Sequence, residues 1–510
     1  MPASANNIFH STANNMGLYQ IKRIACTVAA ITLTLAVMAQ RKPNVIYIYA
    51  DDMGYGELGC YGQQKIKTPN LDKLAAEGMR FTQHYTSTPV CAPARCMLLT
   101  GKNGGHSFIR GNYELGGFAD STEGGQMPLP EGTFTIAKLM KQAGYVTGAT
   151  GKWGLGMSNS SGAPQRQGFD YFYGYLDQKQ AHNYYPTHLW ENDKPAPLNN
   201  PFIFVHRPPL QPGAPDSAFE YFRGNDYAVN RIADKALDFI TQHRNEPFFL
   251  YLPITLPHVS LQAPDSVVQP YIGQFDEPVY YGENGYTPTK HPYATYAGMI
   301  TYLDKQVGRV MALLQQLGLD NNTLVLFSSD NGATFDVGGV KGDVFQSTGG
   351  LRGRKQDLYE GGIREPFIAR WPGKIPAGVV SDEISVQYDI MPTLGELTGT
   401  KAPNADGISL LPVLLGKKTQ QHHPYIYFEF PEKTGQVAVR MGKWKGVKSN
   451  MKKNLHAPWE IYDLDTDRQE AHDVAAQHPD LAARFEAIVQ QEHEPAVIQE
   501  WEFVAPKLHK

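Results

Sequence analysis

Two pairs of oxygen-bearing side chains each lie just beyond an apolar run of the sequence, at residues 44–50 and 323–327. The four residues are Asp51, Asp52, Asp330 and Asn331. Carboxylate and amide oxygens are hard ligands, which calcium and magnesium prefer and which zinc and copper do not. One pair of adjacent acidic residues is equally consistent with a turn or a cap. Two pairs that each end an apolar run instead indicate a shared cation.

A cysteine begins a segment that has the features of a helix N-terminus. Residues 91–101 read Cys-Ala-Pro-Ala-Arg-Cys-Met-Leu-Leu-Thr-Gly. Pro93 suits the first helical turn, where its missing N–H is not needed. Cys91 is then expected at the helix N-terminus, where free N–H groups and the helix dipole favour an anion. Arg95 follows one turn later. The alternative is a structural cysteine beside a turn, with Arg95 on a solvated face.

These residues need a sheet whose strand ends meet. The predicted strands are 44–50, 145–150, 248–252 and 323–327. The predicted helices are 70–78, 135–142 and one whose apolar face carries Ile300, Leu303, Val307, Val310 and Leu314. Strands that alternate with helices imply an α/β fold with a large, mostly parallel sheet flanked by helices. Open α/β sheets bind ligands beyond the carboxyl ends of their strands, so Lys152 and His258 are expected beside the four oxygen ligands.

The pattern changes after residue 399. Residues 438–447 predict an antiparallel hairpin that turns at Gly442, residues 459–464 predict a further strand, and residues 479–492 predict a terminal helix. We therefore expect a catalytic domain at 40–400. A smaller C-terminal α+β subdomain with an antiparallel sheet is expected at 401–510.

The first 39 residues resemble a secretory signal peptide. Lys22 and Arg23 form its basic part, and the apolar stretch 24–38 is short for a membrane span. Residues 37–39 fit a cleavage site, and Met16 is the alternative start of the chain. We therefore expect export to the periplasm or the extracellular space. A membrane anchor is the alternative interpretation of this segment.

The composition is that of a globular protein, with 42% hydrophobic and 19% charged residues in 510. The formal net charge of −4 gives no basic footprint, so nucleic acid is not an expected partner. After the signal segment no run is apolar enough for stable insertion into a membrane. The mature chain would keep Cys60, Cys91 and Cys96, an odd number, which indicates at least one cysteine with a role other than pairing.

Residues 91–101 also resemble the signature of the type I, formylglycine-dependent sulfatases of the alkaline-phosphatase-like superfamily. That signature is Cys-x-Pro-x-Arg, four residues, then Thr-Gly, and the wider resemblance covers about residues 44–470. It implies that a maturation enzyme oxidises Cys91 to a formylglycine aldehyde, whose hydrate attacks the sulfur of a sulfate ester. It also implies a calcium ion, with magnesium as the alternative. The implied metal ligands are Asp51, Asp52, Cys91, Asp330 and Asn331.

The other residues that the resemblance assigns are three cations and a histidine. Arg95 would steady the formylglycine, and Lys152 matches the family's Gly-Lys-Trp element. Lys355 would contact sulfate, since it precedes the block Glu-Gly-Gly-Ile-Arg in residues 351–366. His258, in Leu-Pro-His, would bind or protonate the leaving oxygen. Cations are needed here because sulfuryl transfer develops negative charge around the sulfur.

One position departs from the family pattern. The family commonly has Gly-Lys-Trp-His-Leu-Gly, whereas residues 151–156 read Gly-Lys-Trp-Gly-Leu-Gly. Gly154 has no side chain that could act as a base. The resemblance gives that histidine a role in breaking down the sulfated intermediate, and His106 and His182 are the candidates to replace it.

The segment 178–190 is expected at the mouth of the substrate pocket, because it is rich in aromatic residues. His182 would bind a sugar hydroxyl, and Arg354, beside Lys355, would also reach the substrate. The expected reaction is hydrolysis of a sulfate ester on a sulfated carbohydrate. The first alternative is a formylglycine-dependent phosphoesterase or phosphonate monoester hydrolase. The second is a secreted glycan-binding protein that has lost catalysis, with Gly154 as the sign of that loss.

Overall fold

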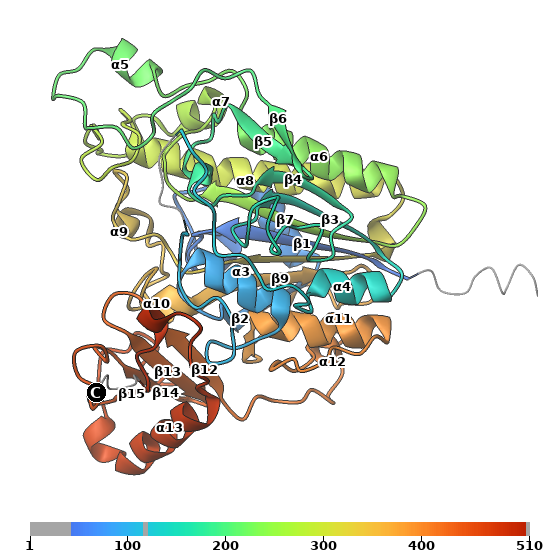
Figure 1. Cartoon of the computed structure of the whole chain (residues 1–510), viewed down its shortest axis with the longest axis vertical. Helices are drawn as coiled ribbons and strands as arrows, with labels where there is room; N and C mark the ends of the chain where they lie inside the picture. The colour runs from blue at the N-terminus through green and yellow to red at the C-terminus, as the bar shows by residue number, and fades with distance from the viewer. Residues whose placement is uncertain (1–41, 116–120, 506–510) are drawn as a thin grey trace, which may run out of the picture. The chain divides into compact units, whose positions relative to one another are not determined.

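A large sheet of 11 strands lies at the centre of the computed structural model, which describes residues 42–115 and 121–505 (Figure 1). Its strands are β1 (Asn44–Asp51), β2 (Met79–Tyr85), β3 (Val146–Lys152), β4 (Tyr171–Tyr175), β5 (His188–Glu191), β6 (Lys194–Pro197), β7 (Phe248–Pro257), β8 (Thr323–Ser329), β9 (Arg364–Arg370), β10 (Val379–Ser381) and β11 (Ser385–Val386). The order is β10-β2-β9-β8-β1-β7-β3-β4-β5-β6, and β11 pairs with β2. The five neighbours β8, β1, β7, β3 and β4 are parallel, whereas β9, β5 and β6 pair antiparallel with their neighbours.

Helices cover both faces of this sheet (Figure 1). One face packs against α2 (Pro69–Ala76), α6 (Ala228–Gln242) and α8 (Pro292–Gln316). The other packs against α3 (Cys91–Thr100), α4 (Ile136–Gln142) and α11 (Ile390–Thr398). In β1, Ile46 and Ile48 belong to the first core and Tyr47 and Tyr49 to the second. Successive strand side chains point to opposite faces, so a strand buried on both faces has a nearly continuous apolar sequence.

Shorter helices lie in the connections. They are α5 (Asp216–Glu220), α7 (Asp265–Val268), α9 (Gly342–Phe345), α10 (Glu360–Ile363) and α12 (Leu411–Leu414). None of the helices within 42–115 and 121–505 is both long and apolar enough to cross a membrane.

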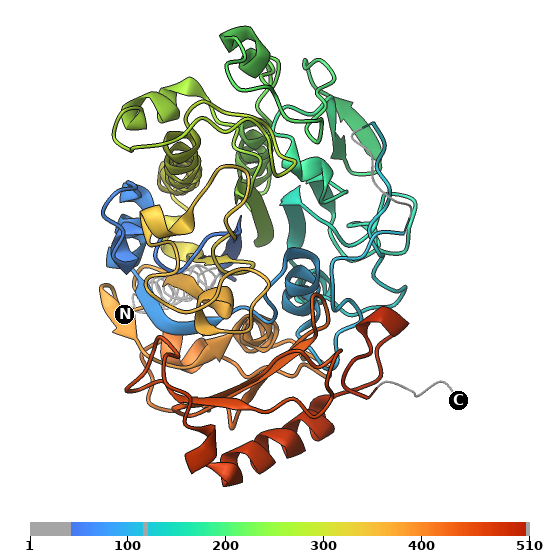
Figure 2. The same cartoon turned by 90° about the vertical axis from the view of Figure 1, so that its left-hand side faces the viewer.

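A second, antiparallel sheet lies near the C-terminus. It has the order β12 (Ile426–Phe430), β13 (Gln436–Met441), β14 (Trp444–Lys448) and β15 (Glu460–Asp463). Ile426 and Phe428 pack against Tyr85 and Ile363 of the large-sheet region. The opposite face packs against Phe485 of α13 (Pro479–Glu492), and Figure 2 shows this helix on the side away from the large sheet.

The predicted fold class is confirmed: a large, mostly parallel sheet flanked by helices, followed by a small antiparallel sheet. The four predicted strands correspond to β1, β3, β7 and β8, of which β7 is five residues longer than 248–252. The hairpin at Gly442 joins β13 to β14, with Met441 opposite Trp444. The domain boundary at residue 400 stays a prediction. The expected signal peptide at 1–39, including the alternative start at Met16, lies outside the described residues.

A buried histidine on β2 makes the stability of this fold depend on pH. The ring of His84 stacks on Phe367, with centroids 4.2 Å apart, and Nδ1 lies 2.9 Å from Ser385 Oγ. Burial lowers the pKa of His84 from 6.5 to about 3. Glu365, directly across the strand pair, does not offset this, because burial raises its own pKa well above the usual range and favours its uncharged form.

We expect the contribution of His84 to the free energy of unfolding to fall as the pH drops below 6.5, because the unfolded chain then binds a proton at His84 that the folded chain does not. The slope from this residue is about 1.4 kcal/mol per pH unit, and it ends near the folded pKa. Urea unfolding at decreasing pH should show the wild type losing stability relative to His84→Phe, as the difference between the two curves. His456→Gln, an exposed control, should keep the wild-type slope. Parallel curves for wild type and His84→Phe would contradict the assignment.

Candidate functional site

The carboxyl ends of four neighbouring parallel strands bring the predicted polar residues together. Ala50 of β1 is in register with Ser329 of β8, and Asp51 is in register with Pro257 of β7. Residues that follow these strands therefore lie at one edge of the sheet. Asp52 has a positive φ of 65°, a sparsely populated conformation for a residue other than glycine. Its N–H donates to Asp330 Oδ1 at 3.0 Å. This bond links the pair Asp51–Asp52 to the pair Asp330–Asn331.

Cys91 is the first residue of α3 and points into this cluster. Its Sγ lies 3.4 Å from Asp51 Oδ1, 3.8 Å from Asp52 Oδ1 and 3.5 Å from Asn331 Oδ1. It is 2% exposed. Burial raises the pKa of the Cys91 thiol well above its usual range, and the charge of Asp330 is the second cause of this rise. A thiolate at this position is therefore strongly disfavoured.

The oxygen atoms around Cys91 fit a hard divalent cation. Asp51, Asp52 and Asn331 each direct one oxygen toward the same sulfur atom, and all three residues are buried. Asp51, Asp52, Cys91 and His258 have potential ligand atoms within 4.8 Å of one another. Asp330 connects two neighbours of these residues: its Oδ1 accepts from Asp52 N, and its Oδ2 accepts from Arg95. The carboxylates of Asp51 and Asp52 and the amide oxygen of Asn331 are donors typical of calcium or magnesium.

Three buried cations face the three carboxylates. Arg95 Nη2 is 2.8 Å from Asp330 Oδ2, and Lys152 Nζ is 2.7 Å from Asp51 Oδ2. Lys355 Nζ is 2.7 Å from Asp52 Oδ1 and 3.3 Å from Cys91 Sγ.

The charges in this cluster act on one another's pKa values. Burial alone would raise the pKa of Asp51, but Lys152, His258 and Arg95 lower it overall. Burial and the charge of Asp51 raise the pKa of Asp330. Burial alone would lower the pKa of Lys355, but Asp52 raises it overall. The cluster is thus a region of opposed charges that water does not screen.

His258 borders the same cluster. Its Nε2 is 3.6 Å from Asp52 Oδ2, and its Nδ1 bonds to the carbonyl oxygen of Val259. Burial lowers the pKa of His258 to about 4. A neutral ring that donates from Nδ1 to this carbonyl presents the Nε2 lone pair to the cluster.

The structure places the two substrate candidates differently. His182 stacks on His258 with ring centroids 4.8 Å apart, and its Nδ1 lies 3.2 Å from His206 Nε2. Its position is therefore next to the cluster. Arg354 instead forms ion pairs with Asp336 and Asp343, and in the described part of the chain none of its contacts is with the residues around Cys91.

His106, the other candidate to replace the histidine absent at position 154, lies outside the cluster around Cys91. His106 Nδ1 pairs with Asp406 at 2.9 Å, and its Nε2 is 4.0 Å from Glu492. These partners belong to the C-terminal part of the chain and not to the cluster.

Two polar residues near Cys91 were missed from the sequence. Asn112 Oδ1 accepts from Ala92 N at 3.1 Å, so it caps the first turn of α3, for which Val90 provides no side-chain cap. Glu432, between β12 and β13, in turn accepts from Asn112 N. The small sheet thereby supports the helix that carries Cys91. Both residues lie in loops, where no periodic pattern marks them.

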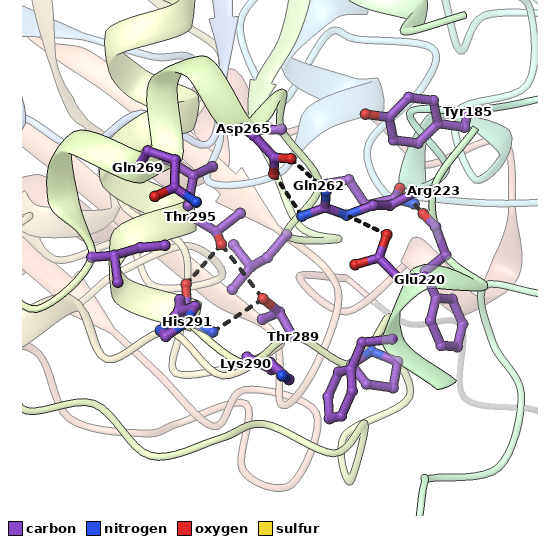
Figure 3. A pocket seen from close by; sticks show the side chains of 17 residues that line it. Tyr185, Glu220, Arg223, Gln262, Asp265, Gln269, Thr289, Lys290, His291 and Thr295 are labelled. Atoms are coloured by element: carbon purple, nitrogen blue, oxygen red, sulfur yellow. Dashed lines mark hydrogen bonds and ion pairs between the residues drawn. The ribbon is translucent and has the colours of Figure 1, made fainter. Parts of the chain in front are cut away.

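A separate pocket of ≈ 260 Å³ lies beside α5, α7 and the start of α8 (Figure 3). Arg223 and Asp265 pair across it at 2.7 Å, and Thr289, His291 and Thr295 are joined by hydrogen bonds. Its lining includes none of the residues that surround Cys91.

The comparisons with known proteins agree on one family. The sequence matches the Sulfatase family over residues 43–400 and the family "N-sulphoglucosamine sulphohydrolase, C-terminal" over residues 354–494. It is 32% identical to the steryl-sulfatase of Rattus norvegicus, covering 76% of this chain and 72% of that one. It is 34% identical to the N-acetylgalactosamine-6-sulfatase of Mus musculus, covering 82% and 76%.

Among solved structures, the crystal structure of Ps i-CgsB in complex with k-i-k-neocarrahexaose is similar, with a TM-score of 0.70 at 26% identity. The similarity covers 89% of this chain and 94% of that one.

Proposed function

Because this chain belongs to the sulfatase family and is a sulfuric ester hydrolase, we propose that it removes sulfate from a sulfated carbohydrate. The observation that carries the proposal is the position of Cys91 Sγ, which lies 3.3–3.8 Å from Lys355 and from three oxygen donors. A nucleophile at this point would have the cations needed for sulfuryl transfer around it.

We assign the nucleophile to residue 91 after its conversion to formylglycine by a maturation enzyme. The unconverted thiol is a poor nucleophile here, because burial and Asp330 disfavour its thiolate. Formylglycine would supply an aldehyde hydrate in place of that thiol. Arg95 would hold the residues around residue 91 in position, because its buried guanidinium donates to both Asp330 and the carbonyl oxygen of Lys152.

We propose that Asp51, Asp52, Asp330 and Asn331 hold calcium, with magnesium as the alternative. The ion would lower the energy of negative charge on residue 91 and on the sulfate oxygens. Lys152 and Lys355 lie on either side of the cluster, bound to Asp51 and Asp52. They would compensate charge on the sulfate, and His258 would donate to the leaving oxygen through Nε2 when that nitrogen carries a proton.

The carbohydrate part of the proposal is supported by names among the relatives. One relative is named N-acetylgalactosamine-6-sulfatase, and one similar structure is a complex with k-i-k-neocarrahexaose. We further propose export to the periplasm or extracellular space through the segment 1–39, followed by the catalytic domain 40–400 and the subdomain 401–510. N-terminal sequencing of the secreted protein would test the cleavage position.

The decisive experiment compares sulfate and phosphate esters of one alcohol and then screens defined sulfated mono- and oligosaccharides. We expect hydrolysis of the sulfate ester to exceed that of the phosphate ester, and release of sulfate from at least one saccharide. A preference for the phosphate or phosphonate ester would support the phosphoesterase alternative. Binding of saccharides without turnover by fully matured protein would support the glycan-binding alternative.

His182 is expected to recognise the sugar. Replacing His182 with alanine should lower kcat/KM for the natural glycan by about 1–3 kcal/mol, the range for leaving a buried polar partner unsatisfied. A small aryl sulfate without sugar hydroxyls should lose far less. His188→Ala is the matched control, because His188 lies in the same segment but contacts Glu123 and Trp190. Equal losses on both substrates would instead assign His182 to the chemistry, as a replacement for the histidine absent at position 154.

A further inference from the structure

The side chain of Gln178 lies next to the helix that carries Cys91, and its orientation is determined by its partners. The N–H of Ala92 can only donate, so Asn112 must present Oδ1 to it, at 3.1 Å. The same Oδ1 lies 3.1 Å from Gln178 Nε2, and it can only accept. Gln178 must therefore direct its NH₂ group toward Asn112 and its Oε1 away from it.

Gln178 Oε1 is buried and has no hydrogen-bond partner within the described residues. It faces Gly154: a Cβ placed at position 154 would lie 3.3 Å from both Gln178 Cβ and Gln178 Oε1. Gly154 has a φ of +74°, which also disfavours a side chain there. Gly154 follows Lys152 by two residues and Ala92 follows Cys91, so Gln178 is linked, through position 154 and through Asn112, to both segments that border the cluster.

The chemistry of the carboxamide limits what this oxygen can bind. Buried acceptors are normally paired, so an unpaired one at an active site indicates a donor supplied by a ligand. Sulfate oxygens are acceptors and would be repelled by Oε1. Lys152 and Lys355 direct their ammonium groups toward Asp51 and Asp52 and not toward Gln178. A neutral carboxamide takes up no proton in the physiological range, so Gln178 does not replace the missing histidine as a base.

We propose that Gln178 determines specificity by accepting, through Oε1, a hydrogen bond from a substrate hydroxyl next to the sulfate ester. This inference rests on the proposed sulfatase activity. It adds that the enzyme distinguishes sulfate esters that have a neighbouring hydroxyl from those that do not.

Two aryl sulfates test the inference directly. 4-Nitrocatechol sulfate has a hydroxyl beside its sulfate, and 4-nitrophenyl sulfate has none. Gln178→Met keeps the length of the side chain but removes the acceptor. We expect this substitution to lower kcat/KM for nitrocatechol sulfate about tenfold relative to that for nitrophenyl sulfate, which is typical of one lost hydrogen bond at a site. The ratio measured on one preparation does not depend on how much of the variant is folded or matured.

Gln167→Met is the matched control, because Gln167 is also buried with an unpartnered Oε1 but bonds Pro130 and Ser161. It should leave the ratio unchanged. An equal loss on both substrates, or no loss on either, would overturn the inference. The first result would mean that Gln178 acts only through Asn112 and α3.

Binding provides a second readout that needs no turnover. In the Cys91→Ala background, calorimetry should show weaker binding of nitrocatechol sulfate on Gln178→Met, with nitrophenyl sulfate unaffected. Equal effects on the two ligands would overturn the inference here too. A wild type that hydrolyses neither sulfate would count against the proposed function, whereas active wild type with an unchanged ratio would count only against Gln178.

Discussion

Replacing Cys91 with alanine should abolish hydrolysis of sulfate esters, with a loss in kcat on the order of 10⁴-fold or more, as expected when a covalent nucleophile is removed. The fold should be unaffected, since the change removes only one atom from a polar cluster. Cys91→Ser should be equally inactive unless the expression host converts serine. Mass spectrometry of active wild-type protein should show the mass loss of thiol-to-aldehyde conversion in the peptide that contains residue 91.

Cys96→Ala provides the control. Cys96 is the other buried cysteine of α3, and its Sγ lies 3.5 Å from Ser107 Oγ, outside the cluster. It should cost some stability and leave the activity of the folded protein unchanged. Full activity of a preparation whose residue 91 is entirely an unmodified thiol would contradict the proposed nucleophile.

Removal of the metal is the second change with a large expected effect. Chelation should eliminate activity and lower the melting temperature, because a ligand that binds only the folded state stabilises it by mass action. At a free metal concentration 100 times Kd this contribution is about 2.7 kcal/mol. Re-addition of calcium should restore both properties, and titration with magnesium would show which ion binds more tightly.

Metal content separates this site from a general loss of stability. Asp51→Ala and Asp330→Ala should purify without the ion. Asp304→Asn should retain it, since Asp304 is a buried carboxylate that accepts from Leu71 N far from the cluster in sequence and in contacts. Full metal content in both Asp51→Ala and Asp330→Ala would mean that the ion binds elsewhere.

The residues at strand ends could be anticipated because parallel strands all end at one edge. Once 44–50, 145–150, 248–252 and 323–327 are identified as buried strands, the positions of Asp51, Lys152, His258 and Asp330 follow from sheet geometry. Cys91 depended on a local motif, residues 91–101, which resemble the family signature and whose proline also indicates the first turn of a helix. In both cases a pattern in the sequence indicated where the fold would place the residue.

Contacts made by loops had no such signal. Asn112, Gln178 and Glu432 lie in three separate connections, in which Asn112 bonds both Gln178 and Glu432. For Arg354 the only signal was its place beside Lys355, and the substrate contact stays a prediction. Its partners are Asp336 and Asp343, whereas Lys355 contacts Asp52.

The burial of Cys91 also constrains the order of events during biosynthesis. A side chain that is 2% exposed and surrounded by Asp51, Asp52 and Lys355 cannot enter the active site of a second enzyme once this chain has folded. Under the proposed maturation, oxidation must precede folding, and the two processes compete for each newly made chain. Rapid overproduction should then yield molecules that are pure, monodisperse and stable yet catalytically silent. Specific activity would depend on the rate of synthesis as well as on the quality of purification.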